Sequence, residues 1–327
     1  MKRGAIQLAQ TLFLLTISAV ALAAPGSEAS QWLERMASAM SNMSYQGTFV
    51  YMKGETMETM RITHVVDDNV VRERLYSVDG PHREILRDDT GVRCVLGEDK
   101  AIVEDLFTAG PIYPQIPFVE LDRPGSPYAF ETGGRGRMAG YPARRVAILP
   151  QDEYRYGYEL WLEENSGLLL KWVLYDAQRN ALAKLMFTSL SLGSDINRAE
   201  LVSDTPSEEF VRLDSPMPQR LLVRSAPRWE PKHLPAGFRL TAHNLVEKNG
   251  DSVFEHLVYS DGLASVSVYI EDESAESRPG DHGSSQLGTA NAFSRHIGQK
   301  HVTVIGEVPS LTVRTIGDAV APSFAAD

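Results

Sequence analysis

The spacing of hydrophobic residues changes from helical to strand-like near residue 45. Before this point, apolar side chains recur every three or four positions, which predicts an amphipathic helix capped by Ser27 or Ser30. They are Trp32, Leu33, Met36, Ala37, Met40 and Met43. After residue 45 the pattern has a period of two, which predicts a strand with two different faces. One face holds Tyr45, Gly47, Phe49 and Tyr51, and the other holds Gln46, Thr48, Val50 and Met52.

Further short strand-like runs follow, separated by Asp, Asn and Gly. They are Met60–Val66, Val70–Val78, His82–Arg87, Val92–Leu96, Ala101–Glu104, Arg144–Leu149, Tyr156–Leu162, Leu168–Tyr175 and Ala181–Leu190. Consecutive short strands favour an antiparallel sheet that curls on itself. The proline-rich but apolar stretch Gly110–Pro127 interrupts them, and such a loop is expected to lie across a core edge or a ligand cavity.

A proline-rich, acidic stretch at 205–227 predicts a boundary between two domains. We therefore expect a first domain at 24–204, a linker at 205–227 and a smaller β-rich domain at 228–320. Its predicted elements are strands at Phe238–Leu245, Val253–Ser260, Ala264–Ile270 and Val302–Val308, a hairpin turn at Asn249–Asp251 and a helix at Leu311–Ala319. The acidic segment Glu271–Ser285 is predicted to be mobile.

The N-terminus has the composition of a cleavable signal peptide. Lys2 and Arg3 precede an uncharged apolar run, and the small-x-small pattern Ala21-Leu22-Ala23 follows it. We expect residues 1–23 to direct export and to be removed, with an uncleaved membrane anchor as the alternative. A lipoprotein anchor is not supported, because no cysteine follows the cleavage point.

Charge and cysteine content narrow the function. The formal net charge of −11 makes the chain a poor candidate for binding nucleic acid, which requires clustered Lys and Arg. Cys94 is the only cysteine, so no intrachain disulfide can form. Its strand-like neighbours predict a buried, inert thiol.

Catalytic and metal-binding patterns are not recognisable in the sequence. Gly134–Ala139 fits a dinucleotide fingerprint by spacing, but no helix can open before Tyr141-Pro142, so a flexible turn is predicted. The eight histidines show no zinc spacing, although a metal site assembled in three dimensions stays open. We expect no enzymatic activity and no cofactor.

Aromatic and methionine side chains instead suggest a cavity for an apolar ligand, with ordinary core packing as the alternative. The tyrosines 154, 156 and 158, the tryptophans 161 and 172, and the methionines 43, 52, 57 and 60 form this set. From strand alternation, the predicted lipid-binding residues are Phe49, Tyr51, Met60, Ile62, Tyr156, Tyr158 and Trp172.

Several runs together resemble the MucB/RseB family. They are Tyr45–Tyr51, Arg72–Leu75, Gly80 with Arg83-Glu84, Arg155–Leu162, Gly167–Lys171, Leu234–Phe238, Tyr259–Tyr269 and Val304–Pro309. The resemblance covers essentially the whole chain after the signal peptide, in the family's order. It does not extend to Gly110–Pro127 or Glu271–Ser285.

The resemblance implies a mainly β fold, with an unclosed β-barrel wrapped around a helix, similar to LolA and LppX, and a smaller β-rich C-terminal domain. It also implies a periplasmic negative regulator of the envelope-stress sigma factor. Such a regulator binds the periplasmic part of an anti-sigma factor (RseA or MucA), shields it from the protease DegS, and is released by lipid or lipopolysaccharide. The expected partner-binding residues are Tyr259, Asp261, Tyr269 and Glu307.

Two other functions are kept open. A lipid or lipoprotein carrier would use the same barrel but has no need for a second domain of this type. A hydrolytic envelope enzyme would need a constellation of side chains that the sequence does not reveal. A second copy of the chain is also kept as a candidate partner.

Overall fold

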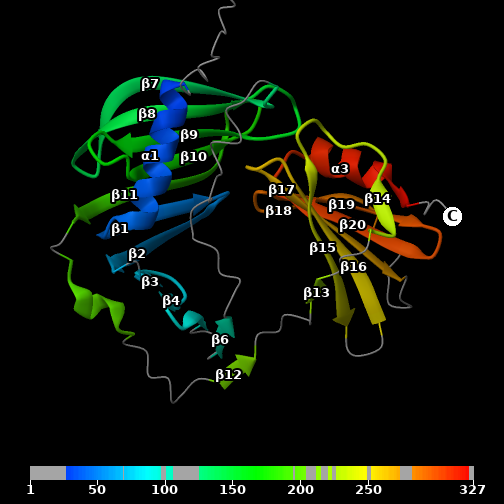
Figure 1. Cartoon of the computed structure of the whole chain (residues 1–327), viewed down its shortest axis with the longest axis horizontal. Helices are drawn as coiled ribbons and strands as arrows, with labels where there is room; N and C mark the ends of the chain where they lie inside the picture. Colours follow the sequence, from blue (N-terminus) through cyan, green and yellow to red (C-terminus); the bar gives the residue numbers. More distant parts are fainter. Residues whose placement is uncertain are drawn as a thin grey trace, which may run out of the picture.

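Two large β-sheets, each with its own hydrophobic core, account for most of the described part of the chain (Figure 1). The computed structural model describes residues 27–68, 70–96, 101–105, 125–193, 196–203, 211–214, 220–222, 226–248, 252–272 and 282–323. The predicted signal peptide, the turn at 249–251 and most of the loop at 110–127 lie outside these ranges. The prediction of a mainly β chain is confirmed.

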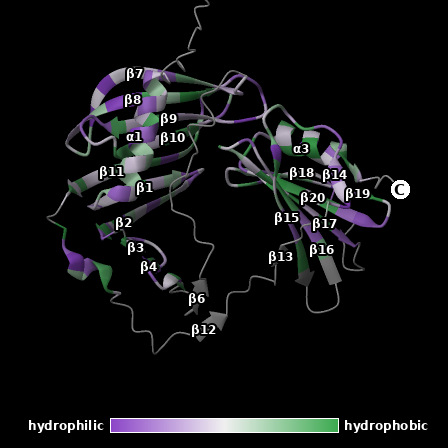
Figure 2. Ribbon diagram, viewed as in Figure 1, coloured by the Kyte–Doolittle hydropathy of each residue, from purple (hydrophilic) through white to green (hydrophobic). Residues whose placement is uncertain are grey.

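Helix α1 (Glu28–Asn42) is the predicted amphipathic helix. The hydroxyl of Ser27 caps it by accepting a hydrogen bond from the amide of Ser30 at 3.2 Å. Its inward stripe includes Leu33 and Met36, which pack into the core of the large sheet. In Figure 2, hydrophilic and hydrophobic segments alternate along α1, as expected for a helix with one buried side.

The large sheet has twelve strands in the order β12-β6-β5-β4-β3-β2-β1-β11-β10-β9-β8-β7. Their bounds are β1 Tyr45–Lys53, β2 Thr56–Asp67, β3 Val70–Ser77, β4 Arg83–Asp88, β5 Gly91–Leu96, β6 Ala101–Asp105, β7 Tyr128–Met138, β8 Tyr141–Pro150, β9 Gly157–Glu163, β10 Leu169–Tyr175, β11 Ala181–Leu192 and β12 Val211–Asp214. The pairs are antiparallel, except that β12 runs parallel to β6. Because β7 and β12 do not pair with each other, the sheet curves around α1 without closing.

Strand β1 carries its apolar side chains on the face that the alternation predicts. Tyr45 and Phe49 are buried in the core shared with α1. Gly47 lies between them, and a Cβ atom there would come within 2.6 Å of the Ser189 carbonyl oxygen. The glycine therefore lets β1 and β11 approach closely.

The prediction of a flexible turn at Gly134–Ala139 is wrong. Residues up to Met138 belong to β7, and the turn is formed by Ala139 and Gly140, with φ angles of 47° and 88°. A register shift between Thr132 and Arg135 marks a β-bulge. Because glycine has no side chain, the alternation of apolar and polar residues was absent from this strand.

The small sheet has seven strands in the order β13-β15-β16-β17-β20-β19-β18. They are β13 Arg220–Leu222, β15 Arg239–Lys248, β16 Ser252–Ser260, β17 Ser265–Asp272, β18 Gly283–Leu287, β19 Ala290–Ile297 and β20 Lys300–Gly306. Helix α3 (Ser310–Ala319) packs on β19 and β20, and the short pair β14 (Trp229–Pro231) and β21 (Val320–Pro322) lies beside it.

The predicted linker contains two short strands, which the prolines had obscured. Strand β12 pairs with the large sheet, and β13 pairs with the small one. After β11, the chain passes through the 3-10 helix η1 (Arg198–Leu201), where Glu200 accepts two hydrogen bonds from Arg61, at 2.6 and 2.8 Å. Likewise, β18 begins inside the segment that was predicted to be mobile.

Candidate functional site

A cavity of about 830 Å³ lies on the concave face of the large sheet and reaches the small sheet. From the large sheet it is lined by Phe49, Tyr51, Lys53, Thr56, Glu58, Met60, Leu75, Arg83, Glu84, Ile85, Cys94, Val95, Tyr158, Trp172 and Leu185. From the small sheet and its turns it is lined by Leu263, Gly288 and Glu307. Its size is that of a site for a small ligand, and both units contribute to its wall.

Five of the seven predicted lipid-binding residues line this cavity: Phe49, Tyr51, Met60, Tyr158 and Trp172. The rings of Tyr51 and Trp172 lie 6.1 Å apart across β1 and β10. Ile62 is instead fully buried in the core. Tyr156 lies at the boundary between the two units, where its hydroxyl accepts a hydrogen bond from Asn291 at 3.1 Å. Whether the five residues bind lipid stays a prediction.

The methionines and the cysteine are placed differently from the prediction. Met60 lines the cavity, but Met52 and Met57 are exposed, so the methionines form no common apolar surface. Cys94 was predicted to be buried, and it is only half-buried, with its side chain lining the cavity. Strand alternation alone could not show this, because the face of β5 depends on what the sheet curves around.

The cavity is lined mainly by apolar side chains, with one buried carboxylate, Glu84, which pairs with Arg74, and with exposed charged residues at its rim. Around the rim, Arg83 pairs with Glu58, and Lys53 pairs with Glu307 at 3.5 Å. Lys53 belongs to β1 and Glu307 follows β20, so the second ion pair joins the two units. Glu307 also accepts a hydrogen bond from the hydroxyl of Thr289.

Another ion pair that joins the two units, between Arg155 and Asp261, is fully buried. The Nη1 atom of Arg155 lies 2.6 Å from Oδ2 of Asp261, and both side chains have 0% exposure. Arg155 also donates from Nε to Asp152 Oδ1 at 2.8 Å and from Nη2 to the carbonyl oxygen of Ala236 at 2.7 Å. The Tyr128 hydroxyl donates to Asp261 Oδ2 at 2.9 Å. We call Tyr128, Arg155 and Asp261 the clasp.

Local structure on both sides positions the clasp. Asp261 Oδ1 accepts from the amides of Leu263 and Ala264, which fixes the turn between β16 and β17. The guanidinium carbon of Arg155 lies 5.2 Å from the ring centre of Phe238. Gly237, the residue before Phe238, has a φ of 86°, a backbone conformation that residues other than glycine rarely adopt. This conformation brings the Ala236 carbonyl oxygen to Arg155.

The clasp brings together three runs that the sequence had singled out separately. They are Arg155–Leu162, Leu234–Phe238 and Tyr259–Tyr269. Two further hydrogen bonds cross the boundary: Asn291 donates to the Tyr156 hydroxyl at 3.1 Å, and Thr312 donates to the carbonyl oxygen of Tyr154 at 2.6 Å. Within the second unit, Asn291 also donates to the carbonyl oxygen of Val308 at 2.8 Å. The fourth run, Val304–Pro309, therefore also meets this boundary.

The four predicted partner-binding residues are not grouped on one open surface. Tyr259 is buried in the core of the small sheet, and Asp261 is part of the clasp. Tyr269 lies on the other face of the small sheet, with its ring stacked 4.5 Å from His256. Glu307 lies at the cavity rim. Their role toward a partner stays a prediction.

Burial raises the pKa of tyrosines at the boundary and in the cavity. Burial, and secondarily the charge of Asp261, raises the pKa of the Tyr128 hydroxyl well above its usual range. Burial also raises the pKa of Tyr158 and of Tyr51, and the negative charge of Glu307 adds to both shifts. The field of Glu307 thus extends into the cavity.

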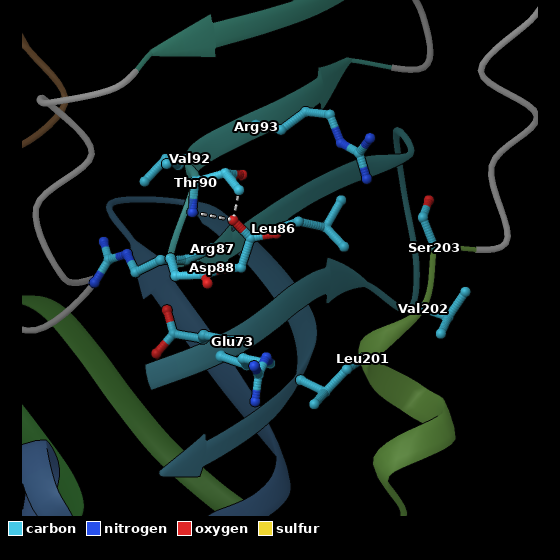
Figure 3. A pocket seen from close by; sticks show the side chains of 13 residues that line it. Glu73, Leu86, Arg87, Asp88, Thr90, Val92, Arg93, Leu201, Val202 and Ser203 are labelled. Carbon is cyan, nitrogen blue, oxygen red and sulfur yellow. Dashed lines mark hydrogen bonds between the residues drawn. The ribbon is translucent and has the colours of Figure 1, made fainter. Parts of the chain in front are cut away.

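A smaller pocket of about 380 Å³ lies elsewhere, at the β4–β5 hairpin and the end of η1 (Figure 3). Its lining includes three arginines, Arg72, Arg87 and Arg93, and three acidic residues, Glu73, Asp88 and Asp89. Thr90 donates from its amide and its hydroxyl to Asp88 at the hairpin turn, and Leu201 and Val202 line the opposite side (Figure 3). Cations and carboxylates are mixed here, so the pocket does not select one sign of charge.

The described ranges contain neither a ready-made cluster of three or more metal-ligating side chains nor a helix that could cross a membrane. No group of three or more His, Cys, Asp or Glu side chains is arranged to hold a metal ion. None of the described helices has the length and apolar character needed to span a bilayer.

Comparison with known proteins gives matches over both units. The family model for the MucB/RseB N-terminal domain matches residues 28–205, and that for the MucB/RseB C-terminal domain matches residues 223–321. The sigma factor AlgU regulatory protein MucB of Pseudomonas aeruginosa is 33% identical over 328 residues, covering 97% of this chain and 98% of that protein. The sigma-E factor regulatory protein RseB of Haemophilus influenzae is 26% identical, covering 97% and 98%.

Solved structures of MucB have the same fold. MucB in complex with MucA(peri) is 31% identical and superimposes with a TM-score of 0.72, covering 91% of this chain and 100% of that chain. A structure of MucB is 30% identical, with a TM-score of 0.60 and coverages of 90% and 98%. The predicted fold class, an unclosed sheet around a helix followed by a smaller β unit, is confirmed.

Proposed function

The chain belongs to the MucB/RseB family, and from this we propose that it binds the periplasmic region of a membrane-spanning anti-sigma factor. The observation that carries this proposal is the match of both units to MucB, which has been crystallised with MucA(peri). In binding, the chain would act as a negative regulator of an envelope-stress sigma factor. No enzymatic step is needed for this role.

The proposal also covers the location of the protein and the role of each domain. Residues 1–23 direct the chain to the periplasm, which is where the partner's exposed region lies. The first domain, 24–204, contributes most of the cavity lining. The second domain, 228–320, contacts the anti-sigma factor. The linker 205–227 joins the two domains. Of the predicted partner residues, Tyr269 and Glu307 are the ones to test first, because Tyr259 is buried in the core and Asp261 belongs to the clasp.

Bound to its partner, the chain shields the anti-sigma factor from the site-one protease DegS, and lipid or lipopolysaccharide releases it. The cavity supports the lipid step, because aromatic and aliphatic side chains make up most of its lining. A ligand can release the partner only if it favours a state that the partner does not bind. Because both units line the cavity, a bound ligand would change the contacts between them, and this change would distinguish the state that binds the partner from the state that does not.

Proteolysis of the partner tests the proposal. Purified chain without residues 1–23 is added at saturating concentration to the periplasmic region of its anti-sigma factor, and the rate of DegS cleavage is measured. We expect cleavage to slow strongly, because the bound chain blocks DegS from reaching the anti-sigma factor. An unchanged rate would refute the proposal.

A lipid carrier remains the second candidate, because the cavity alone fits it. Its cavity wall, however, includes Leu263, Gly288 and Glu307 of the second unit. Removing the chain from Pro227 onward separates the two functions. A carrier would keep its lipid binding, whereas a regulator would lose its partner.

A further inference from the structure

Three histidines form a row at the end of the small sheet that lies farther from the clasp. His296 on β19 and His301 on β20 are directly opposite each other, so their side chains share one face of the sheet. His282 directly precedes the edge strand β18. The ring centres of His296 and His301 are 4.9 Å apart, and those of His282 and His296 are 4.3 Å apart. The three imidazoles are therefore in continuous contact.

The row lies on a polar and accessible face of the sheet. Helix α3 and the hydrophobic core of the second unit pack on the other face of β19 and β20. The next cross-strand pair on the histidine face is Ser294 and Thr303, whose hydroxyl oxygens are 3.3 Å apart. His282 is exposed, and His296 and His301 are half-buried. A small solute can therefore reach the imidazoles, which do not belong to the core.

The spacing of the rings and one unpaired nitrogen fit a metal ion. Imidazole nitrogens bind Zn²⁺ at about 2.0–2.1 Å, so two imidazoles on one ion have ring centres roughly 4.5–5.5 Å apart. The rings of His296 and His301 lie within this range. Nε2 of His301 is buried and has no hydrogen-bond partner among the described residues, although buried polar atoms are almost always paired. Coordination to an ion would satisfy this nitrogen.

The charges around the row favour a cation. Glu271 on β17 is directly opposite His301, on the same face. The basic residues next to the histidines in sequence lie on the other face by strand alternation. There, Arg295 donates to the carbonyl oxygen of Val320, and Lys300 pairs with Asp272 at 2.6 Å. A carboxylate therefore accompanies the imidazoles, while the neighbouring cations are held elsewhere.

From this geometry we propose a site for a divalent transition-metal ion, a property that goes beyond the proposed function. His296 and His301 hold the ion across β19 and β20, and His282 is the third ligand. The ring of His282 lies slightly too close to that of His296 for both to share an ion as they stand, so this exposed side chain turns when the ion binds. Imidazole suits Cu²⁺, Ni²⁺ and Zn²⁺, and Cu²⁺ binds most tightly of these.

A Cu²⁺ titration tests the site directly. The chain without residues 1–23 and without an affinity tag is used, in a Cys94→Ala background, so that the thiol cannot bind copper. Equilibrium dialysis measures the bound metal, and the nitrogen splitting in the electron paramagnetic resonance signal of Cu²⁺ identifies its ligands. We expect one equivalent of Cu²⁺ more than in the His296→Gln/His301→Gln double variant, with nitrogen ligands. Equal binding by the two proteins overturns the proposal.

Single variants assign the ligands. His296→Gln and His301→Gln keep a polar side chain, and each should weaken Cu²⁺ binding by more than about tenfold, the loss seen even for residues that only support a ligand. His282→Gln should weaken binding less than either, and an unchanged affinity would remove His282 from the ligand set. His233→Gln is the matched control, because this exposed histidine lies outside the row. A loss in His233→Gln as large as in His296→Gln contradicts the assignment.

The choice of ion provides a second comparison. Mg²⁺ and Ca²⁺ prefer oxygen ligands, so an excess of either should leave the bound Cu²⁺ in place, whereas Zn²⁺ and Ni²⁺ should compete for it. Displacement of Cu²⁺ by Mg²⁺ or Ca²⁺ at the concentration at which Zn²⁺ acts would show that the imidazoles are not the ligands.

Thermal unfolding shows whether the folded sheet forms the site. An ion that binds the folded chain more tightly than the unfolded chain stabilises it, so Zn²⁺ should raise the Tm of the wild-type chain. The His296→Gln/His301→Gln double variant should fold with a similar Tm without metal and should gain less from Zn²⁺. An equal rise of Tm in both proteins overturns the proposal, because the remaining histidines would then account for the effect.

Discussion

Arg155 shows how much a single side chain can depend on residues far away in the sequence. Its guanidinium has three separate acceptors, on Asp152, Ala236 and Asp261, and it is fully buried. The sequence had marked Arg155 only as part of a motif, and it had marked Asp261 as a residue for an external partner. Local patterns could not pair them, because 106 positions separate the two and no periodicity links them.

Replacing Asp261 by Asn tests the clasp at this scale. The amide keeps the size of the carboxylate but removes the charge opposite Arg155 and replaces one acceptor by a donor. We expect the free energy of unfolding in urea to fall by roughly 3 kcal/mol, the order found when a buried pair loses one partner. Asp272→Asn is the control, because its pair with Lys300 is exposed and should contribute little. Equal effects of the two substitutions would contradict a structural role for the clasp.

The cavity tyrosine Tyr158 predicts how stability changes at high pH. Burial raises the pKa of its hydroxyl above the ordinary value of 10.0, so the unfolded chain loses this proton at a lower pH than the folded chain. The free energy of unfolding should therefore be unaffected by this group below about pH 10 and should fall above it.

Tyr158→Phe removes this group without touching the clasp, so its loss of stability above about pH 10 should be smaller than that of the wild-type chain. Urea unfolding at a series of pH values measures the difference. Identical curves for the two proteins would show that the burial of Tyr158 does not contribute to the pH dependence of the free energy of unfolding.

Among the elements, those with regular periodicity were predicted and those without it were not. Helix α1 follows the three- and four-residue spacing of its apolar side chains, and most strands of the large sheet follow the alternation of apolar and polar residues. Strand β7 is rich in glycine, and β18 is short and exposed throughout, so neither has an alternating pattern to detect. Strand β12 is held by pairing with β6, a contact that only the tertiary fold supplies.

The α1 element depends on its buried stripe. Leu33 is fully buried between the helix and the sheet, so Leu33→Ala should lower the free energy of unfolding by about 2–5 kcal/mol. Glu34→Ala, one position along on the exposed side, should stay within about 0.5 kcal/mol. Chemical denaturation of both variants provides the comparison. A small loss for Leu33→Ala would mean that the sheet holds its shape without the helix.

At the scale of the whole molecule, the relation between the two units is what the sequence left open. Motifs in both halves were visible, but their meeting at the clasp and at the cavity was not. The chain superimposes better on MucB in complex with MucA(peri) than on the other MucB structure, at similar coverage.

Binding to the anti-sigma factor is the central claim, and a direct titration tests it. The chain without residues 1–23 is titrated by calorimetry into the purified periplasmic region of the anti-sigma factor from the same organism. We expect saturable binding with a fixed stoichiometry, weakened when lipopolysaccharide is present. Absence of binding at every soluble concentration would contradict the account.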